Sequence, residues 1–228
     1  MSNEILSDEL VTKDGKVLLI KFKKSKRTAL AINHLGVTAL ISRGIQKKDI
    51  LKYVESNFIK IYSTFQNLSF YGNPDNFFIN EVYFNLIFEE GNFSYFINEE
   101  KQLIFVSGKV KKTSIIKFYE KLLEDFINEN ELKIKNILIK NSIIERPIIF
   151  KVAKSYLGAY NRKKDLIRIN PFIMKFSHDV VMYVILHEYA HTVSFKHDKL
   201  FHEALEKLCP NHRVIEKKSR KNKFAVYI

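Results

Sequence analysis

Hydrophobic positions follow two different periods along this chain, and the period changes where predicted strands give way to predicted helices. Three short β-favouring runs near the start predict strands at 17–22, 28–32 and 37–41. Apolar residues then recur at intervals of four, four and three, which predicts a helix over 46–64 with one face made of Ile50, Val54, Phe58 and Ile61. Alternation returns between positions 82 and 105 and predicts a β-meander.

The second half of the chain carries the longer helical patterns. A helix is expected from about position 113 to position 139. Two strands, separated by a loop around Gly158, and then two helices follow at 148–153, 166–169, 177–190 and 199–208. Ser177 and Asp198 are the expected N-caps of those two helices.

These elements predict an α+β chain in two parts. Residues 1–110 form a β-rich region with one helix and the meander, and residues 111–228 form a helical region with a small sheet. The boundary is expected at Gly108 and the basic run that follows it. No internal repeat is visible in the sequence.

Composition excludes several classes of protein. The chain has 228 residues, of which 46% are hydrophobic, so it can bury a core. Cys209 is the one cysteine, which excludes an intramolecular disulfide framework and a cysteine-based zinc finger. The longest apolar run, 180–186, is far shorter than the ~20 residues of a membrane span. With no basic and apolar leader at its start, the chain is expected to be cytoplasmic and to have no membrane partner.

The net charge of +13 is unevenly distributed. Residues 1–112 hold 16 basic and 12 acidic residues, whereas residues 113–228 hold 22 and 13. A basic half attracts anionic partners, and nucleic acid would be expected to contact the segments 109–112 and 213–223. A lysine-rich composition explains the same excess without any partner.

Histidine is the residue that points to chemistry. Six of the seven histidines lie between His178 and His212, and five residues of that stretch read H-E-x-x-H, from His187 to His191. Two imidazoles four residues apart lie on one face of a helix and can reach one zinc ion. Glu188 lies about 100° further round, where it can accept a proton from a metal-activated water.

A catalytic zinc site needs a third protein ligand. His197, six residues after His191, is the first candidate, and His178, His202 and Glu203 are the alternatives. The spacing equals that of the metzincins, but those enzymes need a methionine further along the chain. Here every methionine lies upstream, at positions 1, 174 and 182, so the chain is not a metzincin.

Residues 183–191 and then 197–201 resemble the YgjP-like family of zincin-type metal-dependent hydrolases, which reads Y-V-V-x-H-E-L-x-H and then H-S-x-x-F. Residues 28–61 and 167–170 are more weakly similar to it. The resemblance implies metal ligands at His187, His191 and His197, a general base at Glu188, and a zincin-like core in which a small sheet lies against the active-site helix.

One segment departs from the family pattern. The family's S-R-W-G-S-C segment is replaced by residues 155–160, which keep only Ser155 and Gly158. Because that segment is expected to line the cleft, the substrate and the activity do not follow from the resemblance. Tyr156 or Tyr160 is a candidate donor to an oxyanion, with packing on the core as the alternative role.

The sequence thus predicts a zinc-dependent hydrolase, and first of all a metallopeptidase acting on a polypeptide. An anionic small-molecule substrate stays open, as in a nucleotide phosphohydrolase, and so does a DNA-associated protease of the SprT-like kind. A nucleic-acid-binding module with a purely structural metal is disfavoured, because such a site needs no carboxylate like that of Glu188 beside it.

Overall fold

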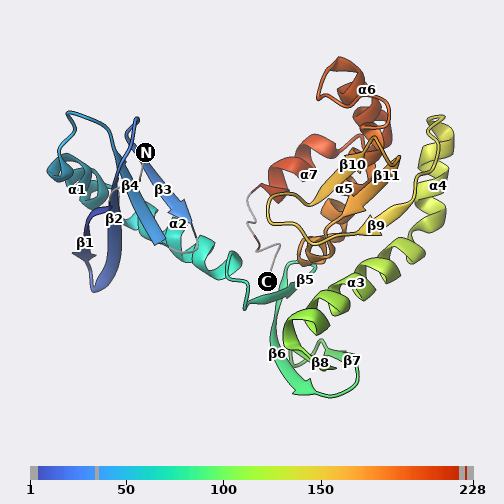
Figure 1. Cartoon of the computed structure of the whole chain (residues 1–228), viewed down its shortest axis with the longest axis horizontal. Helices are drawn as coiled ribbons and strands as arrows, with labels where there is room; N and C mark the ends of the chain where they lie inside the picture. The colour runs from blue at the N-terminus through green and yellow to red at the C-terminus, as the bar shows by residue number, and fades with distance from the viewer. Residues whose placement is uncertain (1–4, 34–35, 221–223, 225–228) are drawn as a thin grey trace. The chain divides into compact units, whose positions relative to one another are not determined.

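The computed structural model describes residues 5–33, 36–220 and 224, and it is a mixed α+β structure with three small sheets in that part of the chain (Figure 1). It divides into two compact units, Met1–Asn73 and Pro74–Ile228. In the described ranges, no helix is both long enough and apolar enough to cross a membrane.

The first unit is a four-stranded sheet covered by two helices. In chain order these elements are β1 (Ile5–Lys13), β2 (Lys16–Lys24), β3 (Ala29–Asn33), β4 (Gly36–Ile41), α1 (Lys47–Ser56) and α2 (Phe58–Tyr71). The predicted strands correspond to β2, β3 and β4. Strand β1 was not predicted, because Val11 is its one buried side chain among those the structure describes and Leu10 is 68% exposed. Without alternating burial, a strand leaves no period-2 pattern.

The helix predicted over 46–64 is two helices that break at Asn57. Its backbone leaves the helical region (φ −112°, ψ 17°), and its side-chain Nδ2 donates to the carbonyl of Tyr53 at 2.9 Å. Val54, Phe58 and Ile61 are nevertheless all buried against the sheet. The predicted apolar face is therefore correct, although the helix is interrupted.

In the second unit, the predicted β-meander is wrong. Strands β5 (Phe77–Ile79), β6 (Val82–Glu90), β7 (Ser94–Asn98) and β8 (Leu103–Gly108) lie in the order β5-β6-β8-β7. Strand β8 lies between β6 and β7, parallel to the first and antiparallel to the second. Alternation identifies which face of a strand is buried, but it says nothing about which neighbour the strand pairs with.

Both four-stranded sheets share one topology. The first has the order β1-β2-β4-β3, and in both sheets the three pairings are antiparallel, parallel and antiparallel. Each is followed by a helix. The repetition lies in strand order, which explains why no repeat is visible in the sequence.

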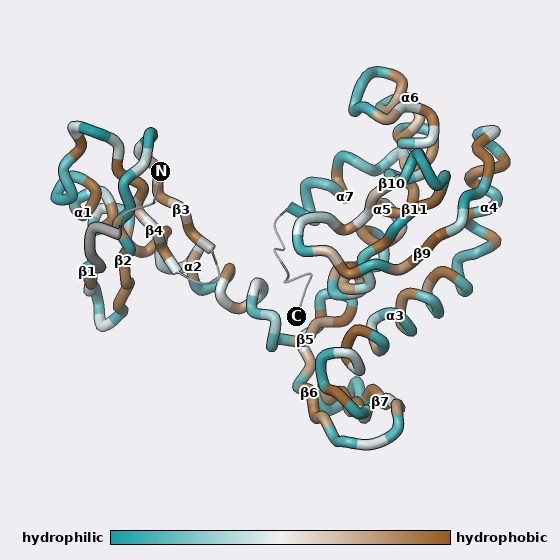
Figure 2. Tube along the Cα trace, viewed as in Figure 1, coloured by the Kyte–Doolittle hydropathy of each residue, from teal (hydrophilic) through white to brown (hydrophobic). Residues whose placement is uncertain are grey.

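The rest of the second unit builds the region of the H-E-x-x-H motif. Its elements are α3 (Lys111–Glu129), α4 (Glu131–Lys140), β9 (Ile148–Phe150), β10 (Gly158–Asn161), β11 (Leu166–Ile169), the 3₁₀-helix η1 (Pro171–Lys175), α5 (His178–Ala190), α6 (Lys199–Leu208) and α7 (His212–Ser219). The third sheet has the order β10-β11-β9, so β10 is an edge strand, and α5 packs against β10 and β11. Figure 2 shows hydrophobic and hydrophilic residues alternating along α3. The basic segment 213–223 begins in α7, and its residues 221–223 lie outside the described ranges.

Strand β10 was predicted as part of a loop, and that prediction is wrong. The strand has four residues, and it begins with a glycine and ends with an asparagine, both of which are depleted in strands. The segment is a strand because it pairs with β11 from Gly158 onwards, and this pairing cannot be inferred from the local amino-acid composition.

The amino end of α5 is capped from a distant turn. Ser177 occupies the predicted N-cap position, but its side chain makes no capping hydrogen bond. Instead, the backbone N–H of Ser177 donates to Glu81 Oε1 (3.3 Å) and that of His178 donates to Asn80 Oδ1 (3.2 Å). Asn80 and Glu81 form the tight turn between β5 and β6, and both have positive φ angles (48° and 69°). Glutamate is strained in that conformation, and the bonds to α5 offset the strain.

These contacts explain why the compact units divide between Asn73 and Pro74, ahead of the boundary expected at 110/111. The same turn also donates its two backbone N–H groups to the carbonyls of Met174 and Lys175. From α3, the buried Tyr119 donates its hydroxyl to the carbonyl of Phe78 (2.9 Å). The strands β5 to β8 are thus bonded to the unit that contains α5.

We therefore expect residues 74–228 to fold cooperatively when expressed alone, whereas residues 111–228 will not. The shorter fragment uncovers Ile115, Phe118 and Tyr119, which are buried, and each contributes about 1.5–3 kcal/mol through burial. Thermal unfolding followed by circular dichroism compares the two fragments. Cooperative unfolding of 111–228 at the temperature of the longer fragment would contradict the expectation and favour the boundary at 110/111.

Candidate metal centre

Helix α5 carries the H-E-x-x-H motif at its carboxyl end. The run Val180 to Leu186 that precedes the motif is buried throughout, so the helix is fixed in the interior of its unit. His187 and Glu188 lie in the last turn of the helix, and His191 is its C-cap residue (φ −66°, ψ −16°). The second histidine of the motif therefore stands where the chain leaves the helix.

A short loop returns His197 to this helix end. Ser194 donates its hydroxyl to Asp198 Oδ2 (2.8 Å), and Asp198 Oδ1 accepts from the N–H of Phe201 (3.1 Å) and caps α6. The same two donors, the Phe201 N–H first, lower the pKa of the Asp198 carboxyl. Ser194 has no positive φ, so the loop closes without the glycine that metzincins carry there. The predicted Asp198 cap thus fixes the residue next to His197.

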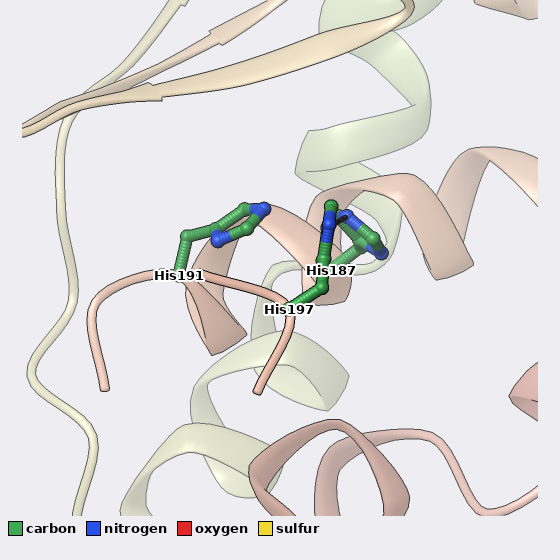
Figure 3. Close-up of side chains that lie close together, drawn as sticks. All are labelled: His187, His191 and His197. Atoms are coloured by element: carbon green, nitrogen blue, oxygen red, sulfur yellow. Dashed lines mark hydrogen bonds between the residues drawn. The ribbon is translucent and has the colours of Figure 1, made fainter. Parts of the chain in front are cut away.

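The three histidines meet at one point (Figure 3). One ring nitrogen from each lies within 4.8 Å of the others, and His187 Nε2 is 3.2 Å from His197 Nε2. Two ligand nitrogens of a tetrahedral zinc site, each ~2.0–2.1 Å from the ion, are about 3.3 Å apart. The donor set and its spacing therefore fit a zinc ion held by His187, His191 and His197.

Hydrogen bonds outside the cluster orient two of the imidazoles. His191 Nδ1 donates to the carbonyl of Ser194 (3.2 Å), which leaves Nε2 with the free lone pair. His187 Nδ1 lies 3.3 Å from the hydroxyl of Tyr183, one helical turn earlier. Such partners fix the ring orientation and the tautomer of metal-binding histidines.

One aromatic side chain supports all three rings. Phe201 is 1% exposed, and its ring centroid lies 4.9 Å from that of His187 and 4.6 Å from those of His191 and His197. Because α6 begins immediately after His197, the cap at Asp198 also positions this phenyl ring. The site thus has an apolar floor beneath three nitrogen donors.

Burial favours the neutral form of two of these imidazoles, those of His187 and His191. It lowers the pKa of His187 to about 4, with further lowering by the neighbouring His191 and His197, and burial also lowers the pKa of His191. A neutral imidazole is the form that binds a metal. His187 and His191 are therefore prepared for a metal at pH values where an ordinary histidine is partly protonated.

Glu188 lies beside the cluster in a buried position that β10 defines. The backbone N–H of Tyr160 donates to Glu188 Oε2 at 2.7 Å, and burial raises the pKa of this carboxyl to about 7. A Cβ atom at Gly158 would lie 2.8 Å from Glu188 Cγ and from Val184 Cγ1, so only glycine allows this approach. The sequence offered Gly158 as a retained position, but nothing in it indicated the N–H of Tyr160.

The alternative third ligands lie elsewhere. His178 is at the other end of α5, about 13 Å along the helix axis from His187. His202 and Glu203 are both exposed on α6, and His202 contacts the ring of Phe201 without joining the cluster. Geometry therefore favours His197 over these three residues.

The two tyrosines proposed as oxyanion donors have other contacts. The Tyr160 hydroxyl donates to Asp165 Oδ1 (2.6 Å), which also accepts from Arg146 Nε (2.6 Å). Tyr156 contributes its backbone carbonyl, which accepts from Asn170 Nδ2 (3.3 Å). The contribution of Tyr160 to the site is therefore its backbone N–H.

Known proteins were compared with the whole chain. The family model for the YgjP-like, metallopeptidase domain matches residues 26–222. A crystal structure of the metallopeptidase zymogen of Methanocaldococcus jannaschii jannalysin is similar at 26% sequence identity, covering 43% of this chain and 94% of that chain, with a TM-score of 0.35. No curated protein matches the chain.

Replacing His197 tests whether it is the third metal ligand rather than His202 or Glu203. We expect His197→Ala to lose zinc during dialysis, because removing a metal ligand costs more affinity than the ~10–100-fold typical of an outer partner. His202→Ala and Glu203→Ala are the matched controls on the same segment, and both will keep the metal. Elemental analysis gives the zinc content, and the reverse pattern would overturn the assignment.

The lowered pKa of His187 predicts a pH dependence. In the metal-free protein its imidazole is expected to titrate near pH 4, below the ~6.5 of an exposed histidine. The lowered pKa contributes stability at pH values above ~6.5, and this contribution is lost as pH falls through 4. NMR of the ring protons, assigned with His187→Gln, measures the midpoint, and a midpoint at 6.5 would contradict the prediction.

Proposed function

This chain belongs to the YgjP-like metallopeptidase family, and we propose from that premise that it is a zinc-dependent peptidase with Glu188 as its general base. His187, His191 and His197 would hold the metal. The observation that carries the proposal is the meeting of three imidazoles on the helix that also carries the buried carboxylate of Glu188. A chain without this chemistry would have no reason to bury that carboxylate next to three nitrogen donors.

Zinc is the metal that the donor set favours. Three imidazole nitrogens are a common protein contribution to catalytic zinc sites, which keep a fourth position open, and the three here lie within 4.8 Å of one another. A zinc ion held there would supply Lewis-acid chemistry, lowering the pKa of a water from 15.7 towards ~7 and polarising the carbonyl of the scissile peptide bond.

Glu188 moves the proton. Its carboxylate accepts a proton from the attacking water as the new C–O bond forms, and returns that proton to the amine nitrogen as the C–N bond breaks. The N–H of Tyr160 holds Oε2 and so fixes the orientation of the carboxylate. Burial brings the pKa of the carboxyl close to neutral pH, where one group can both accept and return a proton.

A polypeptide suits the neighbouring strand. β10 is the edge of its sheet, and an extended peptide can lie along such an edge. Gly158 and Tyr160 bring this edge into contact with Glu188, so a peptide bound there would lie across the proton-transfer group. The anionic substrates that the sequence left open rest on net charge alone.

Glu188→Gln tests the general base. The amide is nearly the same size but cannot accept the proton, so we expect the variant to keep its fold and its zinc while cleavage of an unfolded polypeptide falls by ~10²–10⁴-fold. Glu203→Gln, on the exposed face of α6, is the control and should cleave at the wild-type rate.

The same zinc-loaded proteins are also assayed for hydrolysis of nucleoside triphosphates. Peptide cleavage by Glu188→Gln at the wild-type rate would remove Glu188 from the mechanism. A zinc-loaded wild-type protein that hydrolyses triphosphates and leaves polypeptides intact would overturn the peptidase assignment.

A further inference from the structure

Beside the metal centre, a hollow lined by cations lies at the edge of the β10–β11 hairpin. We propose that it binds an acidic side chain of the substrate, so that the enzyme prefers polypeptides with Glu or Asp next to the scissile bond. This inference rests on the proposed peptidase function, and it adds a substrate class to it.

The hollow lies within one side chain's reach of the cluster. It has a volume of about 590 Å³ and is lined by β10, by the turn residues Arg162 and Lys163, by Arg168 of β11 and by Phe195. Phe195 comes from the loop between two of the metal-site histidines, and its ring centroid is 6.3 Å from that of His191. Tyr160, another lining residue, donates its backbone N–H to Glu188. A peptide bond at the metal centre would thus place a neighbouring side chain in the hollow.

The charge of the hollow is uncompensated. Three of its lining residues are basic, namely Arg162, Lys163 and Arg168, and none is acidic. The nearest carboxylate in the sequence, Asp165, accepts from Arg146 Nε and from the Tyr160 hydroxyl. Asp165 is therefore committed to a different arginine, and the hollow keeps an excess of positive charge.

Among the residues that line the hollow in the described ranges, Arg168 has a buried hydrogen-bond donor without an acceptor. It lies opposite Ala159 in the β10–β11 pairing, and the small side chain of Ala159 leaves room for an incoming group. The Nε of Arg168 is buried and has no hydrogen-bond partner among the described residues. An unpaired buried donor costs free energy, and a carboxylate satisfies a guanidinium with two parallel hydrogen bonds. An acidic substrate side chain would supply the missing acceptor.

The test compares matched peptides. Fluorogenic peptides that differ only in Glu or Gln at one position, scanned over three residues on each side of the scissile bond, are cleaved by the zinc-loaded full chain. We expect the Glu peptide to be preferred in kcat/KM at one position, by on the order of tenfold or more. The same pairs, titrated onto zinc-loaded Glu188→Gln, should show that preference in Kd, which requires no turnover.

Two sets of variants locate the preference. Arg168→Gln should bring the Glu-to-Gln ratio towards one, and so should the double variant Arg162→Gln/Lys163→Gln, whose exposed residues can change without disturbing the core. Arg168→Glu should favour Lys at the same position. Lys112→Gln, an exposed lysine at the start of α3, is the control and should keep the full ratio.

The outcomes separate the two proposals. No peptide cleavage by the wild-type protein would overturn the peptidase function. Cleavage without a Glu preference, or a preference that survives both sets of variants, would overturn the acidic subsite and leave the peptidase standing. A preference that disappears when the peptide C-terminus is amidated would assign the hollow to a terminal carboxylate and overturn the side-chain assignment.

Discussion

The packing of three imidazoles around the buried ring of Phe201 is the constraint on which the rest of the second unit depends. Protonated imidazoles this close repel one another, and burial against apolar surface opposes protonation by lowering the pKa values of His187 and His191. The phenyl ring supplies that apolar surface, and it is set in place by the same aspartate cap that starts α6. The hydrogen-bonded turn at Asp198 thus positions both His197 and the ring of Phe201 against which it packs.

Helix α5 makes contacts at both ends that fix its position. Its amino end takes its capping acceptors from the β5–β6 turn, almost a hundred residues earlier in the chain. Its carboxyl end continues into the loop that returns to α6. The apolar run between them, residues 180–186, is buried over its whole length and anchors the helix in the core. The bonds at the amino end join the four-stranded sheet β5–β8 to the same compact unit as the helix.

Local chemistry made part of this structure predictable from the sequence. The histidine spacing, the cap at Asp198 and the apolar face through Val54 depend on residues close together in the chain, and the structure has the corresponding local geometry. The predicted strand order was wrong because strand pairing depends on residues far apart in the chain. Strand β8 lies between β6 and β7, although the residues at alternate positions from 82 to 105 suggested a meander. The N–H of Tyr160 was equally invisible, since every residue but proline has one and only the tertiary structure selects which one meets Glu188.

The glycine contact between β10 and α5 has a mechanical consequence. The N–H of Tyr160 in the edge strand donates to the Glu188 carboxylate, and Gly158 leaves no room for a side chain between β10 and α5. The position of the carboxylate is therefore coupled to the position of the strand. Any shift of β10 away from α5 would therefore stretch this hydrogen bond or move the Glu188 carboxylate, because the buried apolar run at 180–186 holds the helix itself in the core.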